Sequence, residues 1–142
     1  MVVKTRTTKN KGKIVSVTGT RRRAIARAVA IKGEGSVLVN SKPLSSFPEI
    51  PRLFMSEPLV IGKAIADGLD IKITVNGGGM MGQADAARQA IAKSLVGFSK
   101  TLKNKFLDYD RTMLVADYRR TEPHKPSRSK QGPRVHKQRS KR

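Results

Sequence analysis

The residues of this chain that are best suited to a chemical task are glycines and arginines placed to hold phosphate groups. Gly77, Gly79 and Gly82 satisfy a G-x-G-x-x-G pattern between an expected strand and an expected helix, which is the setting of a dinucleotide-binding loop. The rest of such a site is missing from the sequence, because no later apolar strand ends in an acid placed for a ribose and no Gly-Lys-Ser/Thr triplet occurs. We therefore expect no cofactor.

The same glycines suit the phosphate of a nucleic acid. Backbone N–H groups at the start of a helix bind anionic oxygen atoms, and residues without a Cβ let a sugar-phosphate backbone approach closely. A tight turn with a purely structural role is the alternative. The candidate RNA contacts in this loop are Gly77, Gly78, Gly79 and Gln83.

Arginines gather nearer the amino terminus, at or close to the start of an expected strand. Such a run is often only a solvated charged face, but the strongly basic composition of the chain favours phosphate contact. The six aromatic residues are scattered, which argues against a sheet face that stacks bases. The candidate contacts here are Arg21, Arg22, Arg23 and Arg27.

Residues 119–142 form the most basic segment, with ten Lys or Arg, one acid (Glu122) and one aliphatic residue (Val135). This composition cannot bury enough apolar surface to offset the entropy of ordering the backbone. We expect a long extended tail that takes its order from a polyanion and spans about 80 Å at roughly 3.3 Å per residue. Its candidate phosphate contacts are Arg119, Arg120, Lys125, Arg128, Lys130, Arg134 and Lys137.

Catalytic and metal-binding groupings are not evident in the sequence. His124 and His136 both lie in the basic tail without an acidic ligand set, and the chain has no cysteine. Disulfides, thiolate metal sites and nucleophilic catalysis are therefore not expected. The aspartates stand at the ends of expected elements and do not pair with a plausible base. We expect neither an enzyme nor a metal site.

The net charge of +20 is unevenly distributed along the 142 residues. Residues 1–13 carry five basic residues and no acid, whereas the middle of the chain is close to ordinary. We expect a basic arm at 1–13, a globular domain at 14–117 and the basic tail at 118–142. A polyanion is the expected partner. A membrane is disfavoured because neither arm has an apolar face and no apolar run approaches roughly 20 residues, so we expect a soluble cytoplasmic protein.

The first half of the domain is expected to form strands. Residues 14–18 alternate and are β-branched, which predicts a strand that ends before a glycine. Residues 20–32 are ambiguous, because their alanines favour a helix whereas the alternation of larger residues with alanines favours a strand. The loop at 33–35 indicates a hairpin to a strand at 36–39, and residues 40–43 are typical of a turn.

The second half is expected to alternate helix and strand. Residues 51–67 are helical, and Pro58 is expected to divide them into two short helices. Residues 70–75 predict a strand by their alternation. A short helix is expected at 99–107, whereas residues 113–115 are too few to place. The strongest helix follows the glycine loop, and its expected buried stripe is Ala84, Ala87, Ile91, Leu95 and Phe98.

Several motifs occur in an order that is specific to one family. The first group is residues 19–28 (GTRRRAIARA), 33–35 (GEG) and 39–40 (VN). The second group is residues 75–84 (VNGGGMMGQA) and 88–92 (RQAIA). The third group is residues 117–123 (DYRRTEP) and 138–142 (QRSKR). Together they resemble the signatures of small-subunit ribosomal protein nine over roughly residues 14–142. Residues 122–126 (EPHKP) resemble the archaeal or eukaryotic type, whereas the closing Ser-Lys-Arg resembles the bacterial type.

The resemblance implies an α+β fold like the second domain of small-subunit ribosomal protein five, with a four-stranded sheet and helices packed on one side. It makes residues 23–32 a strand. It also implies that the globular part binds ribosomal RNA in the head of the small subunit, beside neighbouring head proteins, and that the tail reaches the peptidyl site. The transfer-RNA contacts that it implies there are Arg139, Lys141 and Arg142.

Two hypotheses from other functional classes stand beside this one. Charge alone fits a non-ribosomal protein that coats nucleic acid, which would bind duplex DNA and structured RNA equally. The glycine loop alone fits a nucleotide-dependent enzyme, which a nucleotide would stabilise against heat. The resemblance favours a structural role in translation, in the cytoplasmic ribosome, over both.

Overall fold

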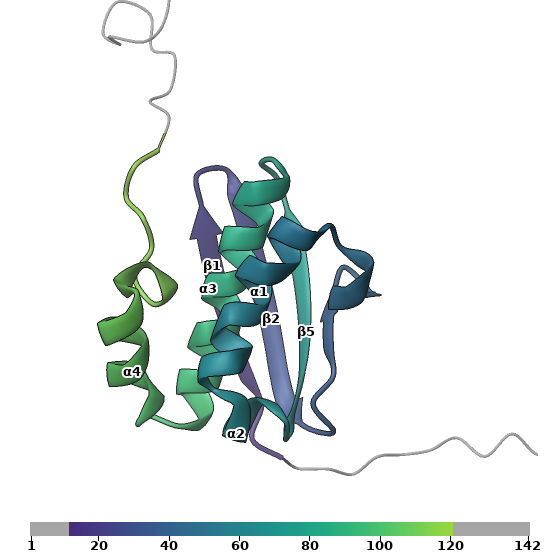
Figure 1. Ribbon diagram of the computed structural model, residues 1–142, viewed down its shortest axis with the longest axis vertical. Coiled ribbons are helices and arrows are strands. Elements are labelled where there is room, and N and C mark those ends of the chain that lie inside the picture. The colour runs from purple at the N-terminus through teal and green to yellow at the C-terminus, as the bar shows by residue number, and fades with distance from the viewer. Residues whose placement is uncertain (1–11, 121–142) are drawn as a thin grey trace, which may run out of the picture.

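The computed structural model describes residues 12–120, in which helices cover one face of a single sheet (Figure 1). The strands are β1 (Val15–Arg21), β2 (Ala24–Lys32), β3 (Val37–Val39), β4 (Lys42–Pro43) and β5 (Leu69–Asn76). The helices are α1 (Glu49–Ile61), α2 (Lys63–Ala66), α3 (Met80–Phe98) and α4 (Leu102–Tyr109), with 3-10 turns at Leu44–Ser46 and Arg111–Met113. The expected α+β class is confirmed. Within this described part of the chain, no helix has the length and apolar character to cross a bilayer.

The sheet has five strands, one more than the four that the family resemblance implied, in the order β1-β2-β5-β3-β4. Strands β1, β2 and β5 are antiparallel neighbours, whereas β3 pairs with β5 in parallel. The additional strand is the two-residue β4, which pairs with Leu38 and Val39 of β3 at the edge. The sequence placed residues 40–43 in a turn, and two residues are too few to leave an alternating pattern that would have identified them as a strand.

The hairpin expected between residues 20–32 and 36–39 is wrong, because β5 lies between β2 and β3. Asp70 of β5 explains this arrangement. Its carboxylate accepts hydrogen bonds from the Ser36 N–H (3.0 Å), the Ser36 hydroxyl (2.8 Å) and the Glu34 N–H (3.1 Å). The bonds from Ser36, more than that from Glu34, hold the pKa of Asp70 below its usual value. The loop is therefore tied to the start of β5 and does not close a tight turn onto β2.

The strand β2 settles the ambiguity of residues 20–32, with an unusual distribution of side chains. Its four alanines are completely buried, while Ile25, Val29 and Ile31 on the opposite face are 38%, 42% and 38% exposed. Small side chains face the helices because α3 lies very close to the sheet. A Cβ built on Gly19 of β1 would stand 2.1 Å from the carbonyl oxygen of Ala86. The larger residues of β2 are consequently left on the open face.

The helix α1 runs through Pro58 without interruption, so the break predicted at this residue is wrong. Pro58 is buried, and its ring contributes apolar surface to the core. The helix ends instead at Gly62, whose N–H donates to the Pro58 carbonyl (3.0 Å), and α2 follows directly. A Cβ at position 62 would lie 2.9 Å from a methyl group of Leu95. The division therefore falls where α1 meets α3.

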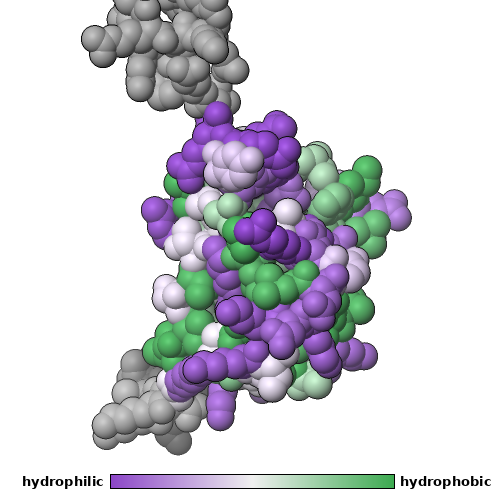
Figure 2. Space-filling model, turned by 90° about the vertical axis from the view of Figure 1, so that its left-hand side faces the viewer, coloured by the Kyte–Doolittle hydropathy of each residue, from purple (hydrophilic) through white to green (hydrophobic). Residues whose placement is uncertain are grey.

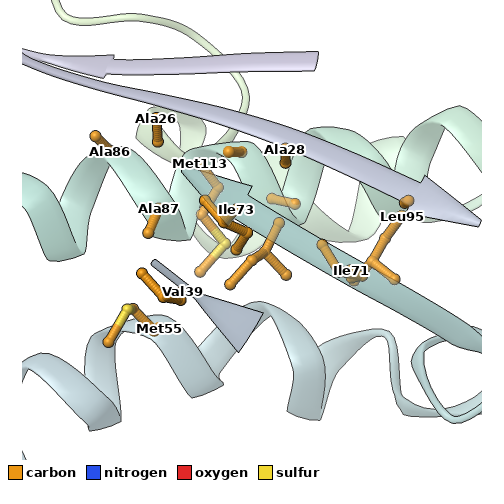
Figure 3. Close-up of a cluster of buried hydrophobic side chains, with 14 of the residues drawn as sticks. Ala26, Ala28, Val39, Met55, Ile71, Ile73, Ala86, Ala87, Leu95 and Met113 are labelled. Carbon is orange, nitrogen blue, oxygen red and sulfur yellow. The ribbon is translucent and has the colours of Figure 1, made fainter. Parts of the chain in front are cut away.

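The helix α3 is the centre of the core, as its stripe predicted. Ala84, Ala87, Ile91 and Leu95 are at most 3% exposed, and Phe98 is half-buried. The short helix expected near residues 99–107 is present as α4, shifted toward the carboxyl end. Figure 3 shows the cluster that α3 forms with β2, β5, β3 and α1, in which the labelled residues include Ala26, Ala28, Val39, Met55, Ile71, Ile73, Ala87 and Leu95.

Asn40 extends the pairing of β3 with β5 through its side chain. The amide accepts a hydrogen bond from the Val75 N–H (2.8 Å) and donates one to the Val75 carbonyl (3.1 Å). Asn40→Ala should lower the free energy of unfolding by about 1–3 kcal/mol, because it leaves two half-buried backbone groups without partners. Urea denaturation followed by circular dichroism measures this loss.

Ser41→Gly provides the control for Asn40→Ala. Asn40 and Ser41 both have positive φ values, +49° and +66°. Glycine adopts this conformation without strain, so Ser41→Gly should be as stable as the parent or slightly more stable. A loss below about 0.5 kcal/mol for Asn40→Ala, the range of an ordinary surface substitution, would show that water replaces the amide.

Candidate nucleic-acid interface

Two of the predicted contacts, Arg22 and Arg23, form the turn that joins β1 to β2. The last paired residues of this hairpin are Arg21 and Ala24, so both arginines stand at its tip, where they are exposed. Arg22 has a φ of +53°, a conformation that is uncommon for a residue with a long side chain. Among residues 12–120, neither of the two guanidinium groups takes part in an ion pair. Both are available to an external anion.

The glycine loop lies directly against this turn. Gly77 and Gly78 have φ values of +75° and +69°, which favour glycine. A Cβ on Gly77 would lie 2.6 Å from the Arg23 carbonyl oxygen, and one on Gly78 would lie 3.0 Å from the Ala24 side chain. Packing of the loop on the turn therefore accounts for glycine at both positions. This is the purely structural role that was the alternative to RNA contact.

Gly79 and Gln83 complete the loop at the start of α3. No atom lies within 4 Å of a Cβ built on Gly79, so a ligand can approach its backbone. The Gln83 side chain donates a hydrogen bond to the Gly77 carbonyl (3.1 Å) and ties the loop to the first turn of the helix. The free N–H groups at the start of α3 are thereby held beside the arginine turn.

The other two arginines of the predicted cluster lie elsewhere. Arg21 ends β1, forms an ion pair with Asp117 and lies 3.5 Å from Asp85, and its side chain is 28% exposed. Arg27 stands in the middle of β2 on the open face of the sheet, between Thr18 of β1 and Thr74 of β5. The four arginines thus occupy three places: the turn, an internal ion pair and the sheet face.

The chain after the Arg111–Met113 turn runs alongside β1 toward the arginine turn (Figure 1). Asp117 fixes this course, and its side chain is only 7% exposed. Its carboxylate accepts hydrogen bonds from the Arg119 Nη2 (2.8 Å) and backbone N–H (2.9 Å), and from the Arg21 guanidinium. These bonds, those from Arg119 foremost, hold the pKa of Asp117 far below its usual value.

Arg120 is brought next to the arginine turn by this course of the chain. It lines a hollow of about 310 Å³ together with Arg22, Arg23 and Ile25. Figure 2 shows hydrophilic side chains gathered at this end of the domain, below the point where residues 121–142 continue. Arg120 therefore meets Arg22 and Arg23, two predicted contacts from the opposite end of the described sequence, at one place.

Gln89 of α3 is a buried polar residue that the sequence reasoning did not single out. It is 4% exposed. Its side-chain oxygen accepts a hydrogen bond from the Thr20 N–H (2.8 Å), and its nitrogen donates one to the Thr112 carbonyl (3.2 Å). Gln89 therefore joins the end of β1 to the segment that leads into the tail. Its polarity within an alanine-rich buried helix was the available signal.

Arg88 of α3 holds the same segment from the other side. It forms ion pairs with Glu57 of α1 (2.5 Å) and with Asp110 (2.9 Å). Partial burial acts to raise the pKa of Asp110, but hydrogen bonds from Thr112 and Arg88 outweigh it and keep the pKa below its usual value. The start of the 110–120 segment is thus anchored to two helices.

The remaining predicted contacts lie outside the described residues. They are Lys125, Arg128, Lys130, Arg134, Lys137, Arg139, Lys141 and Arg142. His124 and His136 also fall there. Within residues 12–120, no three acidic or histidine side chains are grouped so as to hold a metal ion.

Comparison with known proteins gives the setting of this interface. The family model described as ribosomal protein S9/S16 matches residues 19–142. The chain belongs to this family. It is 48% identical to small ribosomal subunit protein uS9 of Methanococcus maripaludis over 132 residues, which covers 90% of this chain and 98% of the relative. The protein of the same name from Aeropyrum pernix is 48% identical over 132 residues, covering 80% of this chain and 87% of the relative.

Membership of the S9/S16 family confirms the resemblance stated from the motifs. A third relative, uS9 of Methanococcus vannielii, is 46% identical over 131 residues. These relatives are archaeal, in agreement with the archaeal or eukaryotic type indicated by residues 122–126. The family is one of structural ribosomal proteins and not of enzymes, which supports the expectation that the glycine loop has no catalytic role.

Proposed function

We propose that this chain is a structural constituent of the small ribosomal subunit whose globular part binds ribosomal RNA in the head and whose tail contacts peptidyl-site transfer RNA. The observation that carries the proposal is the end of the domain where Arg22, Arg23 and Arg120 meet and from which the tail continues. Membership of the S9/S16 family supplies the ribosomal setting in the cytoplasm. The tail residues that we assign to transfer RNA are Arg139, Lys141 and Arg142.

The division of labour follows the distribution of charge. Residues 14–117 act as the anchor, and residues 118–142 act as an arm with ten Lys or Arg among its members. Lys13 lies at the opposite end of the domain, where its amino group donates to the Gly97 carbonyl (2.5 Å). Lys13 and Arg120 therefore lie at opposite ends of the described domain, and we propose that the arms that continue from them meet different RNA segments.

Phosphate contacts explain why such a tail can act on every transfer RNA. Contacts to phosphate oxygens position a protein on nucleic acid and carry no direct sequence information. Lysines and arginines along an extended chain neutralise several phosphates and release their counterions. A tail tip that holds transfer RNA in this way is indifferent to the anticodon, as a peptidyl site requires.

Neighbouring head proteins complete the proposed set of partners, and α1 is the part of the domain suited to them. Ile50, Leu53 and Val60 of this helix are 61%, 54% and 71% exposed. The helix carries Glu49, Arg52 and Glu57, and Glu57 is paired with Arg88, so its surface is close to neutral in contrast to the strongly basic chain. A nearly neutral surface with exposed aliphatic side chains offers little attraction to phosphate and suits a protein partner.

A non-ribosomal protein that coats nucleic acid is the alternative, which charge alone supports. Sedimentation of cell extracts at moderate salt separates the two proposals. The ribosomal role requires that the chain sediments in stoichiometric amount with the small subunit. Free chain, under conditions in which other small-subunit proteins stay bound, would contradict it, as would equal affinity for duplex DNA and small-subunit ribosomal RNA.

Deletion of Ser140–Arg142 tests the role of the tail tip. The truncated protein should still assemble into small subunits, because the described domain is untouched. The subunits should retain peptidyl-site transfer RNA less well, by about a hundredfold if two charged phosphate contacts of roughly 1.5 kcal/mol each are lost. Filter binding of transfer RNA to purified subunits measures the effect. Loss of assembly instead would show that the roles of anchor and tip are reversed.

A further inference from the structure

The start of the tail is bound to the globular domain by Asp117, in a network that spans distant parts of the chain. Asp117 joins Arg21 of β1 to Arg119, and Arg21 in turn reaches Asp85 of α3 at 3.5 Å. The Asp117 side chain is 7% exposed, whereas that of Arg119 is 73% exposed. We call these three residues, Arg21, Asp117 and Arg119, the tail latch.

The tail latch sets the position of Arg120, the residue that follows it. Arg119 is bonded to Asp117 through both its backbone N–H and its guanidinium, so the direction of the chain is set before Arg120. Arg120 then lines the 310 Å³ hollow with Arg22 and Arg23. Three like charges gathered around one hollow repel each other, and such a gathering is stabilised by an anion between them.

We propose that Asp117 is a positioning residue that builds a three-arginine site for one RNA phosphate from Arg22, Arg23 and Arg120. The inference rests on the proposed RNA-binding function and adds to it a defined site and the residue that assembles it. Each of the three guanidinium groups that line the hollow can donate two parallel hydrogen bonds, the geometry that a phosphodiester accepts. The neighbouring glycine loop, open at Gly79, leaves room for the sugar-phosphate backbone on that side.

For Asp117→Asn, the proposal and bulk electrostatics predict opposite changes in RNA affinity. Asp117→Asn removes a negative charge and releases two arginines, so a simple charge model predicts tighter RNA binding. If the latch builds the site, the same change should weaken binding to a transcript of small-subunit ribosomal RNA. The slope of log affinity against log salt should fall by about 1, the change expected for one phosphate contact.

A double-mutant cycle separates the positioning role from a general loss of structure. Arg120→Gln should lower the salt slope by about 1 in the parent and should have almost no further effect in Asp117→Asn. Asp108→Asn, at an exposed position of α4, is the matched charge control and should leave RNA binding unchanged or slightly tighter. Equal effects of Arg120→Gln in both backgrounds would overturn the proposal.

The latch can also be tested without RNA, because the chain has no native cysteine. Spin labels at Ser16→Cys on β1 and Tyr118→Cys, both exposed, should give a narrow distance distribution by pulsed electron paramagnetic resonance in the parent. Asp117→Asn should broaden it, and an unchanged distribution would refute the latch. If Asp117→Asn fails to fold, Arg119→Gln removes the exposed half of the latch and should produce the same broadening.

Different results would overturn the proposed function and the three-arginine site. If the parent protein shows no preference for the ribosomal transcript over duplex DNA of equal length, the proposed function is wrong. If the parent shows this preference but Asp117→Asn binds as tightly or more tightly, only the three-arginine site is wrong.

Discussion

Gly19→Ala is expected to destabilise the domain by about 3 kcal/mol or more, the upper end of what overpacking costs in a protein core. The added Cβ would stand 2.1 Å from the Ala86 carbonyl oxygen and 2.8 Å from the Ala90 nitrogen. Both are backbone atoms of α3, so no side-chain rotation relieves the contact. The helix has to move away from β1 as a unit.

Movement of α3 affects more than one contact, which is why the effect is large. The helix packs against the alanine face of β2, and these alanines are completely buried. Interiors packed at this density do not absorb a shift without losing contacts elsewhere. Near the carboxyl end of the helix, a Cβ on Gly97 would lie 2.6 Å from a methyl group of Val15 on β1. The close approach of α3 to β1 therefore extends from the middle of the helix to its carboxyl end.

Urea denaturation of the two proteins measures the effect through the midpoint, with the slope as a check on two-state behaviour. Gly79→Ser is the matched control, because position 79 has open space around it and serine is a good residue before a helix. This control should have the stability of the parent. Near-parent stability of Gly19→Ala would mean that α3 does not lie as close to β1 as the structure places it.

The sequence predicted those helices and strands whose own residues show a clear hydrophobic pattern. The alternation in residues 70–75 identified β5, and the stripe from Ala84 to Leu95 identified α3 with its buried face. Residues 20–32 could not be assigned from propensity, because alanine is a helix former and the strand carries its larger side chains on the exposed face. Only the close approach of α3, a tertiary feature, makes alanines the right residues there.

The predictions of local structure were wrong where contacts with a distant segment determine the course of the chain. The hairpin prediction at 33–35 used local turn residues and could not show that Asp70, 34 residues away from Ser36, would hold the loop beside β5. At Pro58, the predicted break followed from the cost of a proline within a helix, whereas the burial of its ring and the constraint at Gly62 depend on the packing of α1 on α3.

The candidate site, too, could be predicted from the sequence only in part. The sequence identified the arginines and the glycine loop as residues suited to phosphate, and the structure brings Arg22, Arg23 and the loop together. It gave no sign that Arg21 is used internally, since its partner Asp117 stands 96 residues away. Nor did it show that Gly77 and Gly78 are required by the turn on which they pack.

Deletion of residues 121–142 should change RNA binding more than any single substitution. The deletion removes eight Lys or Arg and one Glu. If all eight cations contact phosphates, the slope of log affinity against log salt falls by about 7 for duplex RNA or about 6 for single strands. Affinity for a small-subunit ribosomal RNA transcript should therefore drop by several orders of magnitude at 50 mM salt and much less at high salt. Filter binding over a salt series measures both quantities.

A variant whose tail has the same residues in scrambled order tests whether the positive charges must follow a defined path. Affinity for free RNA depends mainly on the number of cations, so the scrambled protein should bind the transcript nearly as tightly as the parent. Within the assembled subunit, the order of residues fixes which cation reaches which phosphate and places Lys141 and Arg142 at the tip. The scrambled tail should therefore retain transfer RNA about as poorly as the Ser140–Arg142 deletion, whereas parent-like retention would show that a basic tail of any order suffices.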